Sequence, residues 1–192
     1  RKRLGLPDCL TILSAGGSQG ASRINDAVVH LLSYEQKKGN INHIHGYGKH
    51  GKDTFMQSLA ENGVDPDNEH FIIKEYIDNM YTCMCASDLI ITRAGAMTLT
   101  ELMAIGRASI LIPYPYAAEN HQYYNALTLQ NANAGRIIDD KELTGAVLID
   151  TVTKLTDDPE LLKLMSENAA KLSKHDAAGV ILREITDLMG LE

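Results

Sequence analysis

Residues 92–101, with the sequence TRAGAMTLTE, have the composition of a phosphate-binding turn. Apolar residues precede this stretch at the spacing of a buried strand and follow it at helical spacing, which predicts a strand-to-helix turn at its glycine. A helix that begins there points the free backbone N–H groups of Ala96, Met97 and Thr98 outward, with about half a positive charge at its start. We therefore expect this turn to bind a phosphate or a diphosphate.

Three further side chains of the stretch fit the same chemistry. Arg93 supplies a positive charge, and Gly95 allows the backbone to approach a ligand closely. Glu101 offers a carboxylate that can accept hydrogen bonds from both vicinal hydroxyls of a ribose. A purely structural interpretation also exists, because Thr98 and Glu101 have the S/T-x-x-E spacing of a helix capping box.

A second glycine-rich segment, GGSQG at residues 16–20, follows the first predicted strand. Ser18 and Gln19 offer hydroxyl, amide and backbone donors to a phosphate or a sugar, while the alternative is a plain tight turn. The segment is not G-x-G-x-x-G, and no acidic residue ends the second strand, so a dinucleotide cofactor fits poorly and we expect none.

The segment ENHQ at residues 119–122 is unusually polar and follows two prolines. Asn120, His121 and Gln122 are candidates for ligand contacts, although a helix entry capped by Asn120 is an equally simple interpretation. The histidines of the chain are otherwise scattered without the spacing of a metal site, so we expect no bound metal and treat most of them as surface or packing residues. No Ser-His-Asp or Cys-His arrangement indicates covalent catalysis.

The hydrophobic pattern predicts an α/β fold with a Rossmann-like, parallel six-stranded sheet and helices on both faces. The expected strands are 10–15, 41–45, 70–74, 89–92, 109–112 and 136–138, with helices between them, including one that Asp78 caps. In the common order 3-2-1-4-5-6, strands one and four are neighbours, so the loops 16–20 and 93–98 meet at a ligand-binding crevice. Residues 158–192 form terminal helices, the first capped by Asp158 with Pro159 behind it.

Length and charge limit the class of protein. The chain has 192 residues, 44% of them hydrophobic, which is typical of one globular domain. A net charge of -7 argues against a nucleic-acid-binding surface. No apolar run reaches about 20 residues and no signal peptide is visible, so a cytoplasmic location is expected, with reduced cysteines. The first residue is Arg rather than Met, and we expect the chain to be part of a longer protein.

Four motifs, in this order and at these separations, resemble one known family. They are GGSQGA at 16–21, YIDNM at 76–80, TRAGAMTLTE at 92–101 and ENHQYYNA at 119–126. The whole chain is similar to the C-terminal half of the bacterial peptidoglycan N-acetylglucosaminyltransferases that make lipid II from lipid I, the MurG family. The resemblance implies one half of a two-domain GT-B glycosyltransferase, with this half holding the donor UDP-N-acetylglucosamine.

The resemblance also implies roles for individual residues. Ile77 would contact the uracil through its backbone, and Glu101 would hold the ribose hydroxyls. Residues 96–98 would lie against the diphosphate and Ser18 near the nucleotide phosphates. Gln122, together with Asn120 and His121, would contact the sugar.

For the reaction, the resemblance implies inverting transfer to lipid I, without a metal. The N-terminal domain, absent from this chain, would supply the acceptor site and the general base, so no catalytic residue is expected here. The full-length protein would lie on the cytoplasmic face of the cell membrane and serve cell wall synthesis, cell shape and division. The last helix, 176–189, would reach back to the N-terminal domain, which predicts an uncovered apolar face in this chain.

Three other interpretations are kept open. The chain resembles, less closely, a stand-alone donor subunit that works with a separate membrane-bound acceptor subunit in lipid-linked N-acetylglucosamine transfer. A UDP-N-acetylglucosamine 2-epimerase shares the two-domain plan but needs carboxylates in the sugar pocket, which are not evident near Gln122. A non-catalytic nucleotide-sugar sensor or binding module would use the same donor pocket.

Overall fold

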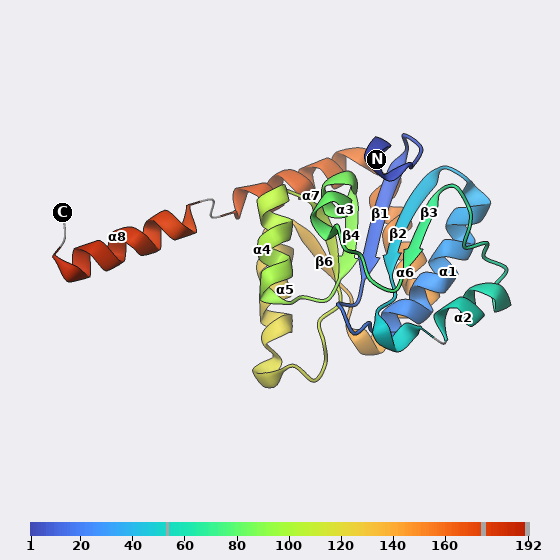
Figure 1. Cartoon of the computed structure of the whole chain (residues 1–192), viewed down its shortest axis with the longest axis horizontal. Helices are drawn as coiled ribbons and strands as arrows, with labels where there is room; N and C mark the ends of the chain where they lie inside the picture. The colour runs from blue at the N-terminus through green and yellow to red at the C-terminus, as the bar shows by residue number, and fades with distance from the viewer. Residues whose placement is uncertain (53, 174–175, 191–192) are drawn as a thin grey trace.

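The fold is a six-stranded parallel sheet, described from a computed structural model that covers residues 1–52, 54–173 and 176–190 (Figure 1). The strand order is β3-β2-β1-β4-β5-β6, which confirms the predicted order. The strands are β1 (Leu10–Ala15), β2 (Ile41–Gly46), β3 (Phe71–Lys74), β4 (Leu89–Thr92), β5 (Ala108–Leu111) and β6 (Gly135–Ile137). The predicted boundaries differ from these by one residue at most.

The central pair β1 and β4 positions the two glycine-containing loops. Ile12 pairs with Leu89, and the register ends with Ala15 opposite Thr92. All three of Ile12, Leu89 and Ile91 are fully buried, as expected for strands that are covered on both faces. Because both strands are parallel and end together, the segments that follow them emerge side by side.

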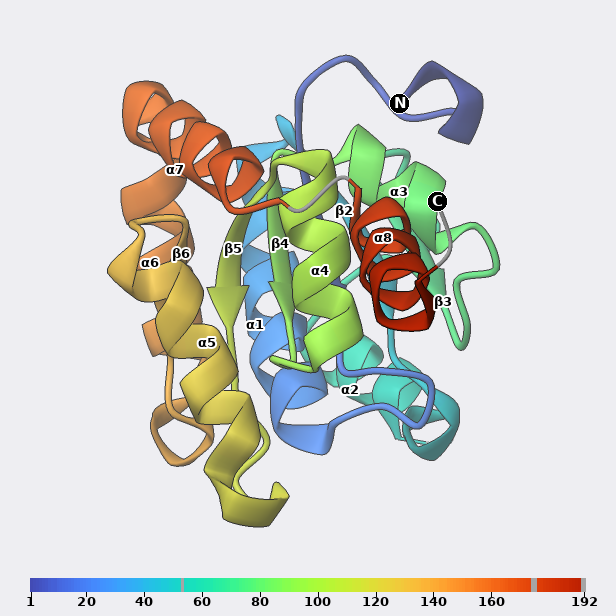
Figure 2. The ribbon, with the colours of Figure 1, turned by 90° about the vertical axis from the view of Figure 1, so that its left-hand side faces the viewer.

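Helices cover both faces of the sheet (Figure 2). One core packs the sheet against α1 (Ser22–Lys38), α2 (Phe55–Glu61) and α6 (Gly145–Thr156), and the other packs it against α3 (Met80–Ala86), α4 (Ala96–Ile105) and α5 (His121–Asn131). Short 3-10 turns occur at η1 (Lys2–Leu4), η2 (Lys49–Gly51), η3 (Ala118–Asn120) and η4 (Asp140–Glu142). In α1, for example, the buried side chains Ile24, Val28 and Leu31 recur at the helical spacing of one sheet-facing side.

Three predicted helix caps can be compared with the structure, at Asp158, Asp78 and Asn120. Asp158 caps α7 (Pro159–Lys171) by accepting from the Leu161 N–H, with Pro159 in the first turn as predicted. Asp78 does not cap α3, which begins at Met80 after Asn79, so that prediction was wrong. Asn120 does precede α5, but its side chain makes no cap hydrogen bond, because its backbone is left-handed with φ at 53°.

The last helix, α8 (Ala177–Met189), extends away from the body of the fold (Figure 1). Its apolar side chains Ile181, Ile185 and Leu188 are 60%, 47% and 86% exposed. Among the described helices, none is long and apolar enough to cross a membrane.

We predict that α8 is the least protected helix of this chain in hydrogen exchange. A 13-residue helix without a packed apolar face is marginally stable in water, so its amides should exchange about 100-fold faster or more than those of β1 and β4. Mass-spectrometric exchange on monomeric protein measures this. Protection of α8 equal to that of the sheet would contradict the expectation of an uncovered apolar face.

A buried polar chain links α1 to strands β1 and β2. Ser14 Oγ lies 2.7 Å from both His43 Nε2 and His45 Nδ1, and Glu35 Oε2 lies 2.7 Å from His43 Nδ1. All four side chains are buried. We expected most histidines to be surface or packing residues, and that expectation did not include a hydrogen-bonded network of His43 and His45. Burial away from water holds the pKa of His45 well below its ordinary value of 6.5, and neighbouring His43 lowers it further.

This low pKa predicts an acid-dependent loss of stability. Below about pH 6.5 the unfolded chain protonates His45 while the folded chain does not, so the free energy of unfolding falls by up to ~1.4 kcal/mol per pH unit. His45→Phe, whose ring can pack against Phe55 as the imidazole does, should remove this component. Urea unfolding at pH 7.5, 6.5 and 5.5 compares the two proteins.

The same comparison separates the effect of His45 from that of Glu35, the buried carboxylic acid of the network. Burial raises the pKa of Glu35, an effect that His43 opposes, so Glu35 destabilises the fold as the pH rises above 4.5 in both proteins. The difference between the two unfolding curves therefore reports His45. Equal pH slopes for the wild type and His45→Phe would refute the assignment.

Candidate functional site

The loop after β1 is held against the loop after β2 by backbone hydrogen bonds. The N–H groups of Lys49 and His50 donate to the carbonyls of Ser18 and Gln19, at 3.2 and 2.9 Å. Gly20 and Gly48 both have positive φ, and a Cβ on either would overlap the backbone of the other loop. The glycines of the GGSQG segment therefore permit a close crossing of two loops, in addition to shaping a turn.

The loop after β4 leads directly into the start of α4. Gly95 is the N-cap, with extended backbone and no side-chain cap hydrogen bond, and the Leu99 N–H is the first to be donated back, to the Gly95 carbonyl. The first-turn amides of α4 have no intrahelical acceptors, as predicted. Thr98 lies inside this first turn, so the alternative in which Thr98 and Glu101 form a capping box is wrong.

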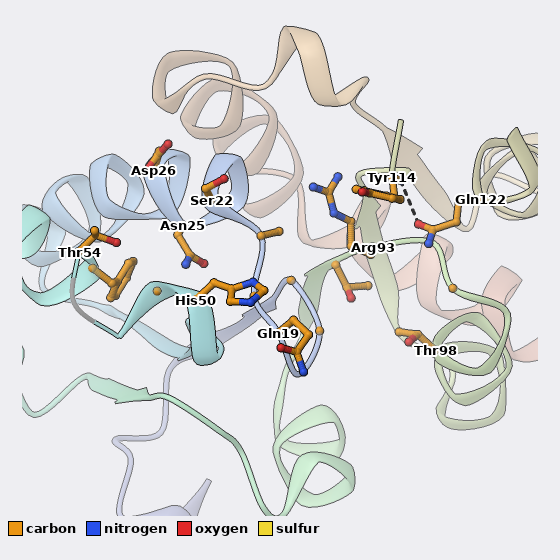
Figure 3. A pocket seen from close by; sticks show the side chains of 18 of the residues that line it. Gln19, Ser22, Asn25, Asp26, His50, Thr54, Arg93, Thr98, Tyr114 and Gln122 are labelled. Carbon is orange, nitrogen blue, oxygen red and sulfur yellow. Dashed lines mark hydrogen bonds between the residues drawn. The ribbon is translucent and has the colours of Figure 1, made fainter. Parts of the chain in front are cut away.

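A cavity of about 590 Å³ opens where these two loops meet (Figure 3). Five of the predicted site residues line it: Gln19, Arg93, Gly95, Thr98 and Gln122. They come from the β1 loop, from the β4 loop with the start of α4, and from the start of α5. The sheet order predicted this convergence, because it placed strands one and four side by side.

Two smaller hollows adjoin this cavity and contain three other predicted residues. Ser18 and Ile77 line a hollow of about 180 Å³, and Glu101 lines one of about 80 Å³ together with Thr98. Gly17 borders the cavity and both hollows. We refer to the cavity and these two hollows together as the groove. They lie at the carboxyl ends of β1, β2 and β4, and Thr98 lines both the cavity and the hollow with Glu101.

The remaining predicted residues lie beside the groove. Ala96 and Met97 are exposed at the start of α4, and Asn120 and His121 are exposed before and at the start of α5. The His121 ring nitrogen Nδ1 lies 2.9 Å from the Ala118 carbonyl. None of these four lines the cavity or the two hollows described above.

Arg93 has a structural partner that the sequence did not reveal. Its Nη1 lies 2.6 Å from Asp140 Oδ1 and also donates to the carbonyls of Ile112 and Pro113. Both side chains of the ion pair are largely buried. Asp140 therefore balances much of the charge that the sequence assigned to ligand binding, and the amides of α4 become the more direct source of positive potential.

Gln122 is oriented by the segment that follows β5. Its Oε1 accepts from the Tyr114 backbone N–H at 3.0 Å, so its amide nitrogen is free to donate to a ligand in the cavity (Figure 3). Tyr114 lines the same cavity, and the Arg93 guanidinium lies 5.6 Å from the centre of its ring. Glu119 and Asn120 have left-handed backbones just ahead of Gln122, which is strain of the kind concentrated at functional sites.

The opposite wall of the cavity consists of residues that the sequence did not single out as a site. It is lined by Ser22, Asn25, Asp26, His50, Thr54 and Ser58. In the part of the chain that the structure describes, no group of three His, Cys, Asp or Glu residues could hold a metal ion.

Comparison with known proteins identifies the family. Residues 11–181 match the glycosyltransferase family 28 C-terminal domain. A relative from Desulforamulus reducens is 39% identical over 95% of this chain and 49% of its own length, and one from Thermoanaerobacter sp. is 41% identical over 92% and 48%. Both are UDP-N-acetylglucosamine--N-acetylmuramyl-(pentapeptide) pyrophosphoryl-undecaprenol N-acetylglucosamine transferases. The chain spans about half the length of the curated relatives that it matches.

Solved structures agree with this fold. MurG of Acinetobacter baumannii matches 94% of this chain and 52% of its own, with a TM-score of 0.81 and 29% identity. The C-terminal CMP-Kdo binding domain of WaaA from the same organism matches 88% of this chain and 92% of its own, with a TM-score of 0.63, but at 13% identity it shows the fold alone. With a six-stranded Rossmann-like sheet and a family match over residues 11–181, this chain belongs to the glycosyltransferase family 28 C-terminal domain family.

Proposed function

We propose that this chain is the donor-binding domain of an inverting glycosyltransferase. It would bind UDP-N-acetylglucosamine for transfer of N-acetylglucosamine to an N-acetylmuramyl-(pentapeptide) pyrophosphoryl-undecaprenol acceptor, in peptidoglycan synthesis. The observation that carries the proposal is the groove that joins the β1 loop, the start of α4 and Glu101, in a chain with transferase relatives about 40% identical. The lipid-linked acceptor implies work at a membrane surface, and we place the whole protein at the cytoplasmic face as part of this proposal.

Each part of the donor matches a part of the groove. Ile77 lines the hollow where a flat uracil would lie, and Glu101, which lines the other hollow, would accept hydrogen bonds from the ribose hydroxyls. The diphosphate would lie against the first-turn amides of α4 and near Ser18. The sugar would then reach the larger cavity, where the free amide nitrogen of Gln122 can donate to a hydroxyl.

The contribution of this domain to the reaction would be leaving-group stabilisation. When an acceptor hydroxyl attacks the anomeric carbon, the bond to the diphosphate breaks and UDP departs with additional negative charge. The N-terminus of α4 faces that charge with fixed N–H dipoles, which need no reorganisation during the reaction. The acceptor site and general base are assigned to a second domain, so the isolated chain should bind donor without completing transfer.

The competing functions are less well supported. Structures of UDP-N-acetylglucosamine 2-epimerases share the fold, with TM-scores of 0.74 and 0.66, but at 14% and 12% identity. A binding module or a stand-alone donor subunit would have the same groove. Those alternatives differ from our proposal in the partner domain or subunit that would act together with this chain.

Isothermal calorimetry tests the proposal. The folded chain should bind UDP-N-acetylglucosamine and UDP saturably, with the same affinity in EDTA, and should not bind NAD. Binding that disappears with EDTA would refute the metal-independent site. Failure of a folded sample to bind either UDP compound would refute the proposed donor domain for this chain.

A further inference from the structure

The large cavity extends beyond the groups that the donor would occupy. The proposed uracil and ribose contacts lie in the adjoining hollows, and Gly95, Thr98 and Gln122 lie on one wall of the cavity. The facing wall is formed by side chains of α1, η2 and α2 and of Thr54, which precedes α2 (Figure 3). We call this wall the α1 compartment, and its residues are Ser22, Asn25, Asp26, His50, Thr54 and Ser58.

Asn25 presents an unused hydrogen-bond acceptor in the α1 compartment. Its side chain is 5% exposed, and its Nδ2 donates to the Tyr47 carbonyl at 2.9 Å. Because that nitrogen must face a carbonyl, the orientation of the amide is determined, and its Oδ1 is buried without a hydrogen-bond partner among the described residues. Because this oxygen is buried, a ligand N–H or O–H group reaches it only if the Asn25 side chain turns toward the cavity that the residue lines.

Gly51 leaves room for the Asn25 amide. A Cβ on Gly51 would come within 2.7 Å of Asn25 Nδ2, so the absence of a side chain at this position allows η2 to approach α1. The Gln19–His50 backbone hydrogen bond then places the same turn against the β1 loop. The α1 compartment is therefore built on helix α1 and on a turn braced from two sides.

The charge of the compartment indicates the chemistry of its ligand. Its residues provide the Asp26 carboxylate, the Asn25 carbonyl and the hydroxyls of Ser22, Thr54 and Ser58, and no lysine or arginine among the described residues contributes to this wall. These acceptor groups favour a ligand that carries hydroxyl and amide N–H donors. A sugar with an N-acetyl group has this chemistry.

We propose that the α1 compartment binds the sugar of the acceptor, so that this domain contributes to the acceptor site as well as to the donor site. This inference rests on the proposed function. One cavity then holds both reactants, with the acceptor sugar on the α1 side and the donor sugar beside Gln122, and the β1 loop lies between the two walls. The arrangement brings an acceptor hydroxyl toward the donor within one cavity.

The test uses the whole chain, labelled with ¹⁵N, and soluble N-acetylmuramyl-pentapeptide as the probe, with UDP-N-acetylglucosamine titrated separately. Asp26→Asn and Thr54→Val alter exposed side chains of the compartment while preserving their shape. Each should weaken the binding of the probe about fivefold or more, the cost of one lost hydrogen bond, and leave donor affinity within about twofold. Asp150→Asn makes the same charge change at an exposed position of α6 and is the matched control.

Each outcome has a distinct meaning. Probe-dependent shifts of the amides of residues 22–26, 50–52 and 54, weakened by both variants but not by Asp150→Asn, support the α1 compartment as an acceptor subsite. Donor binding without any probe binding overturns this inference and leaves the proposed function intact. Variants that weaken the donor instead assign the wall to the donor and also overturn it. Loss of both ligands in the folded wild type would refute the proposed function itself.

Discussion

Glu101→Ala is expected to lower the affinity for UDP-N-acetylglucosamine by about 100-fold, which corresponds to ~2.7 kcal/mol. The carboxylate lies at the hollow that adjoins Thr98, where it would accept hydrogen bonds from both ribose hydroxyls. Hydrogen bonds to a charged group are each worth ~1.5–3 kcal/mol, so a bidentate pair is worth ~3 kcal/mol or more, and the expected loss lies near this lower limit because Glu101 is exposed. Calorimetry on the wild type and the variant measures the change.

Two controls make this result specific. Glu167→Ala removes the same charge from an exposed position on α7 and should leave the affinity unchanged. The 2′-deoxy analogue of UDP should bind the wild type more weakly than UDP does, yet bind Glu101→Ala about as well as UDP, because the partner of that hydroxyl is already absent. Additive losses from the two changes would show that Glu101 does not hold the ribose.

Gly48→Ala is expected to destabilise the fold by ~3–5 kcal/mol and to abolish donor binding at 25 °C. Gly48 has φ at 71° and ψ at 167°, a conformation that is essentially restricted to glycine. A Cβ at this position would also overlap the backbone of Gly20, which has no flexible side chain to move aside. Relief of that overlap must separate the β1 and β2 loops, and the cavity lies between them and the start of α4.

Urea denaturation together with calorimetry measures both effects. Gly63→Ala is the matched control, since Gly63 also has positive φ, at 67°, but open space surrounds the position of its missing Cβ. That variant should lose only ~1 kcal/mol, the cost of the backbone conformation alone. Equal losses for the two variants would show that the close crossing of the loops contributes nothing to stability.

The architecture followed from the sequence because it depends on local patterns. Short predicted strands of three to six residues, separated by amphipathic helices, indicated six parallel strands, and the strand order then implied that the loops after β1 and β4 meet. The start of α4 was also predictable, since its signal is contained in ten consecutive residues. Gln19, Arg93, Gly95, Thr98 and Gln122 line one cavity as a consequence.

The partners of several polar side chains depended on the tertiary structure. Arg93 and Asp140 are 47 residues apart and meet because β4, β5 and β6 are adjacent. Ser14 joins His43 and His45 because β1 pairs with β2 in a register that places Ser14 opposite His45. No local spacing announces such contacts, because burial leaves a polar group only the partners that packing brings to it.

The α1 compartment likewise combines a helix that the sequence predicted with contacts that form only in the tertiary structure. Asn25 and Asp26 belong to an ordinary amphipathic helix, and the sequence treated His50 as one of several scattered histidines. They border one cavity because Gly20 and Gly48 let two loops cross at backbone distance and because η2 packs on α1. Periodicity encodes which face of an element is buried, whereas the long-range contacts that assemble the facing wall exist only when the chain has folded.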